Sequence, residues 1–408
     1  MECGAQAVAE SRVLSDNGSV IDLKRILALW RAMEADGSDY VLATVVAVEG
    51  SSYRRPGALM LLTANGQRAG TVSGGCLEAQ VASRAWWLTA NGPTVERYST
   101  AEDDGERPYG SGCGGVVSLL LERPATAGPF LAVLERAFDL RVPFAAATVL
   151  DGPQMGRRAF AGIDRVDQGD SGGEAGSATM GNEPMQSLAE RALEWRACFE
   201  QQFASDGIET RVWSDYRPAR PGLWIYGAGD DAQPLQRLAR ELGWWVSVAD
   251  GRSHLATRER FPAADEVRVL PIRELPSEAP ERLPALGDLR QEDAAVVMTH
   301  SFEQDSKILA GLLALEAQPA YIGVLGPQRR TRELLAEAAR LLGYAFSSAP
   351  AQVERWLARI HAPTGLDLGA NSPETIALSV LAEIQKFRKA ATALPLRQVR
   401  GAHTAIVG

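Results

Sequence analysis

Cysteine is scarce in this chain, which has four cysteines in 408 residues. So few cysteines exclude a small secreted scaffold held together by disulfides. Long apolar runs are missing as well, because no stretch approaches the roughly 18 apolar residues that a transmembrane helix requires. The first residues, MECGAQAVAESRVLSDNGS, have neither the cationic nor the apolar region of a secretory signal. We therefore expect a cytoplasmic protein with reduced cysteines and no membrane partner.

Positive charge is in the minority, with 42 Lys and Arg residues against 51 Asp and Glu residues and a formal net charge of −9. This balance argues against nucleic acid as a partner, because phosphate backbones are bound by clustered positive charge. Hydrophobic residues make up 46% of the chain and charged residues 23%, which is typical of globular proteins. The length predicts at least two domains.

The first half of the chain reads as an α/β domain over 19–216. Apolar, β-branched runs predict strands, and apolar residues at helical spacing predict helices. The strands are expected at 40–49, 58–63, 68–72, 115–121, 144–150, 157–163 and 209–214, and the helices at 19–33, 76–89, 129–140 and 188–204. The segment 167–187 is rich in Gly, Ser and acidic residues and predicts a flexible insertion. We expect a flexible tail over 1–18.

The second half alternates short apolar strands with helices, beginning at the Pro-rich hinge RPARPG over 217–222. The strands are expected at 223–226, 244–249, 266–269, 294–299 and 320–324, and the helices at 231–242, 304–317, 329–342 and 373–390. Ser372 is expected to cap the last helix and Pro373 to begin it. This alternation predicts a Rossmann-like, doubly wound parallel sheet over 217–395. Residues 396–408 are expected to form a second tail.

A glycine turn follows the first strand of the second domain. Gly227 permits a tight turn, and Gly229 lets the backbone approach a phosphate at the start of the next helix. Asp250 lies 23 residues after Gly227, at the end of the second strand, where a dinucleotide fold places its ribose acceptor. Against this interpretation, Ala232 stands where the third glycine belongs, and Asp230 and Asp231 would repel a pyrophosphate. The turn therefore predicts either a nucleotide-like ligand or a packing role.

Two loops in the first half each place a cysteine among glycines. The first is TVSGGCLE over 71–78, with Cys76, and the second is YGSGCGG over 109–115, with Cys113. The glycines leave the backbone bare for a close ligand, and a helix N-terminus would favour the thiolate of Cys76. Convergence of the cysteines would allow a metal centre, a redox disulfide or a sulfur donor, although their spacing does not fit zinc. The alternative is two buried structural cysteines.

Further loops offer groups for an anion. The loop GSSYRRPG over 50–57 carries Arg54 and Arg55, whose planar guanidinium groups suit a negatively charged ligand or simply face solvent. His300 follows a predicted strand, at the edge where α/β sheets bind ligands. Arg329, Arg330 and Arg332 follow the last predicted strand and face either an anion or solvent.

Several motifs together resemble the XdhC/CoxI family. They are, in order, GSSYRRPGALM, SGGCLEA, GCGG, WIYGAGDDAQPL, VVMTHSFEQD, YIGVLG and APTGLDLGANSPETIALSVLAEI. The resemblance covers roughly 40–120 and 220–390. It implies an N-terminal domain of the XdhC/CoxI type, a C-terminal Rossmann-like domain, and a role as accessory protein to molybdenum hydroxylases such as xanthine dehydrogenase.

The resemblance implies a chaperone rather than an enzyme. Such a protein binds the molybdenum cofactor (molybdopterin or its dinucleotide form), protects it, helps to sulfurate it and inserts it into an apo molybdenum hydroxylase. A cysteine desulfurase is an expected second partner, and we expect a homodimer, the commonest oligomer of soluble proteins. By the same resemblance Cys76 and Cys113 become candidate metal ligands. The other candidate cofactor-binding residues are Ser73, Gly74, Gly75, Gly112, Gly114, Arg54, Arg55, Gly227, Gly229, Asp250 and His300.

Two departures from the family pattern lie in the second half. The family's glycine turn usually reads GAGH, and Asp230 replaces that histidine here; Pro327 stands where serine is common. Two functions other than the chaperone also remain open. One is an NAD(P)-dependent oxidoreductase that uses Gly227, Gly229 and Asp250. The other is a thiol or sulfur-transfer protein that uses Cys76 and Cys113.

Overall fold

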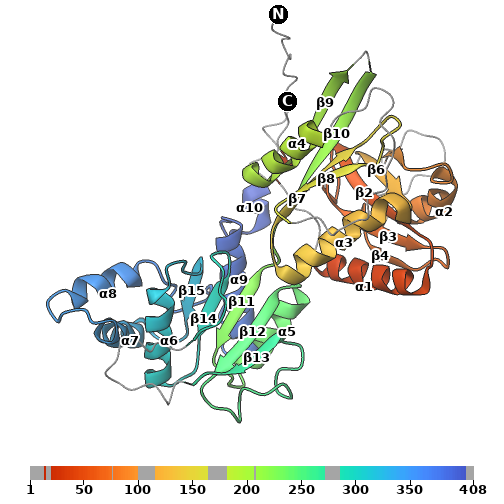
Figure 1. Cartoon of the computed structure of the whole chain (residues 1–408). Coiled ribbons are helices and arrows are strands. Elements are labelled where there is room, and N and C mark those ends of the chain that lie inside the picture. The colour runs from red at the N-terminus through yellow and green to blue at the C-terminus, as the bar shows by residue number, and fades with distance from the viewer. Residues whose placement is uncertain are drawn as a thin grey trace, which may run out of the picture. The chain divides into compact units, whose positions relative to one another are not determined.

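The computed structural model describes residues 13–14, 20–75, 77–99, 115–163, 182–205, 208–271 and 285–400. The chain forms two compact units that divide between Arg220 and Pro221, inside the Pro-rich segment 217–222 (Figure 1). The first unit contains two five-stranded antiparallel sheets, and the second contains one five-stranded parallel sheet. Across these described ranges, no helix has the length and apolar character needed to cross a bilayer.

The first sheet of unit 1 has helices on both faces. Its strand order is β4-β3-β2-β6-β5, and the strands are β2 (Tyr40–Glu49), β3 (Leu59–Thr63), β4 (Arg68–Gly70), β5 (Thr94–Ser99) and β6 (Val116–Glu122). Helices α1 (Val20–Asp36) and α3 (Pro124–Leu140) cover one face, and α2 (Glu78–Leu88) covers the other. Alternate residues of β2 serve both layers: Leu42 packs with α1 and α3, whereas Val41 packs with α2. This double burial explains why the strand is apolar throughout.

In the second sheet of unit 1, one strand packs Ala145 and Ala147 on one helix and Phe144 and Ala146 on α3. Its order is β1-β9-β10-β7-β8, and the strands are β1 (Val13–Leu14), β7 (Phe144–Val149), β8 (Arg158–Ala161), β9 (Ala197–Ser205) and β10 (Ile208–Arg217). Helix α4 (Asn182–Trp195) packs Leu188 and Ala192 against Ala145 and Ala147 of β7. The small alanine side chains allow the helix to lie close to the sheet.

Parts of unit 1 differ from the prediction. The helix predicted over 188–204 is wrong beyond Trp195, because Arg196 adopts a left-handed conformation (φ +52°) and β9 follows. Phe199 and Phe203 pack with α4, and pairing with β10 outweighs helix propensity. Strand β5 was not predicted. Helix α4 begins within the predicted insertion 167–187, and β1 pairs with β9 within the predicted tail 1–18. In unit 2, helix α10 (Leu396–Arg400) lies within the predicted tail 396–408.

Unit 2 has the predicted parallel sheet, in the order β13-β12-β11-β14-β15. The strands are β11 (Gly222–Tyr226), β12 (Trp245–Asp250), β13 (Glu266–Val269), β14 (Ala294–Val297) and β15 (Tyr321–Val324). Helices α6 (Phe302–Ala314), α7 (Gln328–Leu341) and α8 (Ala349–Leu357) cover one face, and α5 (Ala232–Glu241) and α9 (Pro373–Arg388) cover the other (Figure 1). The α/β fold class and the doubly wound C-terminal sheet are thus confirmed.

Unit 2 shows the predicted cap of its last long helix and a reversal in its strand order. The predicted cap of α9 is confirmed, since Ser372 accepts a hydrogen bond from the Thr375 backbone N–H and Pro373 begins the helix. The chain winds in opposite directions from β11, toward β12 and toward β14. Open α/β sheets bind ligands outside the carboxyl ends of their strands at such a reversal.

Candidate functional site

The described candidate site residues are divided between the two units. Unit 1 contains Arg54, Arg55, Ser73, Gly74 and Gly75, and unit 2 contains Gly227, Gly229, Asp250 and His300. Cys76, Gly112, Cys113 and Gly114 lie outside the described residues.

One buried carboxylate organises the first glycine–cysteine loop. Glu78, at the start of α2, accepts hydrogen bonds from the backbone N–H groups of Val72 (3.1 Å) and Ser73 (3.0 Å). It also accepts from the hydroxyls of Thr71 and Ser73, the latter at 2.7 Å. Ser73 Oγ in turn accepts from the Leu77 N–H at 2.9 Å. The loop is therefore tied to the helix on both sides of the glycine pair.

These hydrogen bonds keep Glu78 charged inside the protein. Burial raises the pKa of this carboxyl, but the hydrogen bonds from Thr71 and Ser73 outweigh burial and lower it to about 2. The hydroxyl of Ser73 donates to Glu78 and accepts from Leu77, so its role is to shape the loop. Gly75 is different, because it is exposed, has φ +126° and, among the described residues, has no atom within 4 Å of the position that a Cβ would take. Bare backbone is therefore available immediately before Cys76.

The β2–β3 loop over 50–57 contacts one glycine of each glycine–cysteine loop, Gly74 in the first and Gly115 in the second. A Cβ at Gly74 would lie 2.7 Å from Cδ1 of Tyr53, so this glycine lets the Tyr53 ring pack on the first loop. A Cβ at Gly115 would lie 2.3 Å from the Ser51 carbonyl oxygen, so this glycine lets β6 begin against the same segment. The described parts of both glycine–cysteine loops therefore border one common loop.

The two predicted arginines of this common loop are not equivalent. Arg54 donates from Nη2 to Asp22 in α1 at 2.7 Å, so it fastens the loop to the helix. Its guanidinium also lies 5.6 Å from the centroid of the Tyr53 ring. Arg55 is exposed and is the better placed of the two to meet an anionic ligand.

In unit 2, the glycine turn brings two strands together. Gly227 has φ +137°, and a Cβ there would lie 2.4 Å from the Met298 carbonyl oxygen. Only glycine therefore allows the end of β11 to approach the end of β14 this closely. At Gly229 a Cβ would meet Oδ1 of Asp231 at 2.7 Å, which is a side-chain neighbour rather than backbone.

Asp250 is already occupied by protein groups. It accepts from the Ala228 N–H at 2.8 Å and from the Arg252 backbone N–H at 2.8 Å. Arg252 also donates from Nε (2.9 Å) and Nη2 (2.7 Å), a bidentate pair. Burial raises the pKa of the Asp250 carboxyl, but the hydrogen bonds from Arg252 and from the Ala228 N–H lower it by more. The pKa is therefore below its ordinary value, and the carboxylate stays charged. A ribose hydroxyl could reach this carboxylate only if Arg252 withdrew, so the predicted ribose contact gains no support.

A second buried aspartate holds the end of β14. Asp305 in α6 accepts from the Thr299 N–H (3.1 Å) and from the Thr299 hydroxyl (2.6 Å). Arg330 in α7 donates to the other oxygen of Asp305 at 2.6 Å. Arg252 donates to the carbonyl of Thr299 at 3.0 Å. Arg252 and Arg330 are thus connected through Thr299 and Asp305.

His300 adopts a left-handed conformation (φ +62°) at the end of this strand. Its Nε2 lies 2.7 Å from Asp231 Oδ2, which joins the β14–α6 loop to the glycine turn. Asp231 occupies the N-cap position of α5 but makes no side-chain cap hydrogen bond. The neighbouring Asp230 pairs with Arg260 at 2.7 Å.

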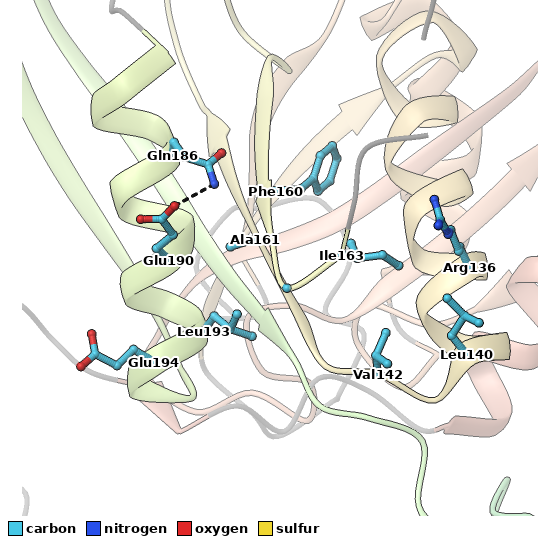
Figure 2. Close-up of a pocket in the computed structure, with 11 residues that line it drawn as sticks. Arg136, Leu140, Val142, Phe160, Ala161, Ile163, Gln186, Glu190, Leu193 and Glu194 are labelled. Carbon is cyan, nitrogen blue, oxygen red and sulfur yellow. Dashed lines mark hydrogen bonds between the residues drawn. The ribbon is translucent and has the colours of Figure 1, made fainter. Parts of the chain in front are cut away.

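A cavity and a buried cysteine of unit 1 belong to neither group of candidate residues. A cavity of about 630 Å³ lies between α3, β8 and α4, and none of the predicted site residues lines it (Figure 2). Among the described residues, no cluster of three or more His, Cys, Asp or Glu side chains is arranged to hold a metal ion. Cys198 is buried against Asp215, and this burial raises the pKa of its thiol, as expected of a structural cysteine.

The prediction from sequence missed three residues that organise these regions, namely Glu78, Arg252 and Asp305. Arg330 was named as facing an anion or solvent, but its partner Asp305 was not. Two of them left a signal: Glu78 follows the glycine pair within one helical turn, and Arg252 follows Asp250 by two residues at a strand end. The pairing of Asp305 with Arg330 spans 25 residues and depends on the parallel sheet, so no local spacing indicates it.

Comparisons with known proteins agree across both units. The family model described as the XdhC Rossmann domain matches residues 223–384, and the model of the XdhC and CoxI family matches residues 33–99. A probable xanthine dehydrogenase subunit of Bacillus subtilis (strain 168) is 30% identical over 363 residues, which are 88% of this chain and 96% of that protein. The "Molybdenum cofactor insertion chaperone PaoD" of Escherichia coli (strain K12) is 26% identical over 368 residues, 88% of this chain and 86% of PaoD.

A solved structure has the same fold. The crystal structure of a xanthine dehydrogenase from Bacillus halodurans superposes with a TM-score of 0.65 and 26% sequence identity, over 90% of this chain and 96% of that one. The similarity therefore extends over both units and is not confined to the Rossmann-like half.

Proposed function

Because this chain belongs to the XdhC and CoxI family, we propose that it is a chaperone that binds the molybdenum cofactor and inserts it into an apo molybdenum hydroxylase of the xanthine dehydrogenase type. The name of the Escherichia coli relative, a molybdenum cofactor insertion chaperone, supports this role. We include in the proposal that the chain protects the cofactor and assists its sulfuration, with a cysteine desulfurase as second partner. A cytoplasmic homodimer completes the proposal.

The single observation that carries the proposal is the shared contact of the two glycine–cysteine loops. Gly74 packs on Tyr53 and Gly115 packs on Ser51, two residues apart in the β2–β3 loop. Cys76 and Cys113 each stand two residues from one of these glycines. The described parts of the two glycine–cysteine loops thus meet the same segment. This contact supports the joint use of both cysteines on one ligand.

The residues present fit a soft metal centre carried on an anionic organic group. Thiolates of Cys76 and Cys113 would be suitable ligands for a thiophilic metal. The cofactor, when bound, would supply that metal as molybdenum. Gly75 leaves open space beside Cys76, and exposed Arg55 offers a planar donor to an anionic group. Glu78, whose oxygens are all used, holds Ser73 and Gly74 in place rather than touching the ligand.

Substitution of the cysteines tests this role. Cys76→Ala and Cys113→Ala are each expected to lower the molybdenum retained per chain after anaerobic incubation with purified cofactor and gel filtration, because each removes one soft ligand. Cys3→Ala is the matched control, since Cys3 belongs to neither loop. Circular dichroism confirms that each variant folds. If both loop variants retain molybdenum as the parent chain does, the cysteines are not ligands.

The alternative of an NAD(P)-dependent oxidoreductase has less support. Its expected ribose acceptor, Asp250, is fully buried and bonded to Arg252. The glycine Gly227 is explained by its contact with the backbone of Met298. A nicotinamide-dependent change in absorbance with a substrate would favour this alternative over the chaperone.

A further inference from the structure

Three pairs of side chains at the carboxyl edge of the parallel sheet share one orientation. In each pair an aspartate is more buried than the nitrogen-bearing partner that it holds. The exposed fractions of the side chains are 0% for Asp250 and 27% for Arg252, 1% for Asp305 and 26% for Arg330, and 16% for Asp231 and 61% for His300. The carboxylates thus lie inward, and the groups that can bind an anion face outward.

The three outward groups converge on the end of β14. Arg252 donates to the Thr299 carbonyl at 3.0 Å, and His300 is the next residue of the chain. Arg330 reaches the same point through Asp305, which accepts from both the N–H and the hydroxyl of Thr299. The hydrogen bond to Asp250 is the main cause that raises the pKa of Arg252. The charges of Asp305 and Asp231 also raise it, so the three pairs lie close together. This point is where the strand order reverses, the usual place for a ligand.

We infer that Arg252, Arg330 and His300 form a binding site for the phosphate group of a nucleotide-like ligand. Guanidinium groups whose orientation is fixed by a buried carboxylate lose little conformational freedom when they bind phosphate. The inference deepens the proposed function and rests on it for the source of the ligand, since the phosphate could belong to the molybdenum cofactor or to a free nucleotide.

The side chains replace donors that the helix does not offer. In a typical dinucleotide fold the N–H groups at the start of the helix face the phosphate. Here the N–H groups of Ala232 and Gln233 donate to backbone carbonyls at 3.2 and 3.4 Å, and Pro234 has no N–H. Phosphate binding at this edge would therefore depend on Arg252, Arg330 and His300 rather than on α5.

The fourth pair at this edge has the opposite orientation. Asp230 is 88% exposed and its partner Arg260 is 28% exposed, so here the carboxylate faces solvent. A carboxylate in this position repels a phosphate. Asp230 therefore weakens the site, and its removal is expected to strengthen binding.

Titration calorimetry with inorganic pyrophosphate, on cofactor-free full-length chain at fixed ionic strength, tests the inference. We expect His300→Asn and Arg330→Lys to weaken binding about fivefold each, because each removes one well-placed donor. Both changes suit the fold: asparagine tolerates a left-handed backbone, and lysine preserves the charge opposite Asp305. Asp230→Asn is expected to strengthen binding about threefold. Arg329→Lys, on the 92% exposed neighbour of Arg330, is the matched control and is expected to leave binding unchanged.

Two results would overturn the inference. One is no binding of pyrophosphate to the parent chain at millimolar concentration. The other is equal binding by the parent, His300→Asn and Arg330→Lys chains. Parallel titrations with NAD⁺ and with the purified cofactor identify the source: the ligand whose binding is weakened by both His300→Asn and Arg330→Lys supplies the phosphate.

The test is independent of the proposed function. Molybdenum binding without pyrophosphate binding would refute the phosphate site and leave the chaperone intact. Pyrophosphate binding that follows the expected order of variants, in a chain that never binds molybdenum, would refute the chaperone and leave the phosphate site intact.

Discussion

Glu78→Gln tests whether one buried carboxylate holds the loop over 71–75. The substitution keeps the size of the side chain, but it removes the charge and replaces one acceptor oxygen with an amide group. In the parent chain Oε1 accepts from the backbone of Val72 and Ser73, and Oε2 accepts from the Ser73 hydroxyl. A hydrogen bond to a charged group contributes about 1.5–3 kcal/mol. With one or two of them weakened, we expect a loss of about 2–4 kcal/mol in the folding free energy of unit 1.

The dependence of this loss on pH follows from the pKa of Glu78. Burial raises that pKa, but hydrogen bonds from Thr71 and Ser73 lower it from an ordinary value of 4.5 to about 2, equivalent to about 3 kcal/mol. Because the folded-state pKa is depressed, this stability is present above pH 4.5 and is lost as the pH falls through 2. The difference in stability between parent and variant should therefore be largest near neutrality and shrink in acid.

Hydrogen exchange measured by mass spectrometry on a peptide spanning 71–78 is the direct assay. The amides of Val72 and Ser73 should exchange faster in Glu78→Gln, and denaturant unfolding should give the loss of stability. Glu49→Gln is the control, because the side chain of Glu49 is 63% exposed and pairs only at the surface with Arg97. Unchanged exchange over 71–78, or a loss no greater than that of the control, would refute the reasoning.

Three further predictions concern packing, charge and thiol reactivity. Gly227→Ala should destabilise unit 2 by about 3 kcal/mol or more in denaturant unfolding, because its Cβ would meet the Met298 carbonyl at φ +137°; a near-neutral effect would contradict the close approach of the two strands. Arg158→Met should cost about 3–5 kcal/mol in thermal or denaturant unfolding, because it leaves the fully buried carboxylate of Glu122 unpaired. Adding Glu122→Gln should recover part of that loss, and the absence of any recovery would disprove the pairing argument. Cys198 should react slowly with a thiol reagent in a folded chain that lacks the other three cysteines, because burial raises its pKa; rapid labelling before denaturation would show that the thiol is accessible.

Periodicity and composition predicted the parallel sheet of unit 2 well, for a physical reason. Strands buried on both faces must be apolar along their whole length, as Leu223 and Trp224 pack on opposite helical layers. The same reasoning failed at Ala197–Ser205, where the residues before the strand are helical and pairing with β10 decides the structure. Local propensity cannot reveal a partner strand that lies elsewhere in the chain.

For the candidate site residues, the sequence indicated places along the chain but not the groups that each side chain contacts. Spacing located Asp250 at the end of β12, yet it could not show that Arg252 occupies both of its oxygens. Of the three arginines after the last strand, only the structure distinguishes Arg330, which binds Asp305, from Arg329 on the surface of α7. Such differences depend on tertiary contacts between groups that are distant in sequence.

The molybdenum and pterin content of the chain, purified without oxygen from a host that makes the cofactor, tests the central claim most directly. Metal analysis gives molybdenum per chain, and the fluorescence of the oxidised pterin gives the organic part. The proposed function predicts near-stoichiometric amounts of both. Absence of both, together with failure of purified cofactor to bind when it is added back, would contradict the claim that this chain carries the cofactor.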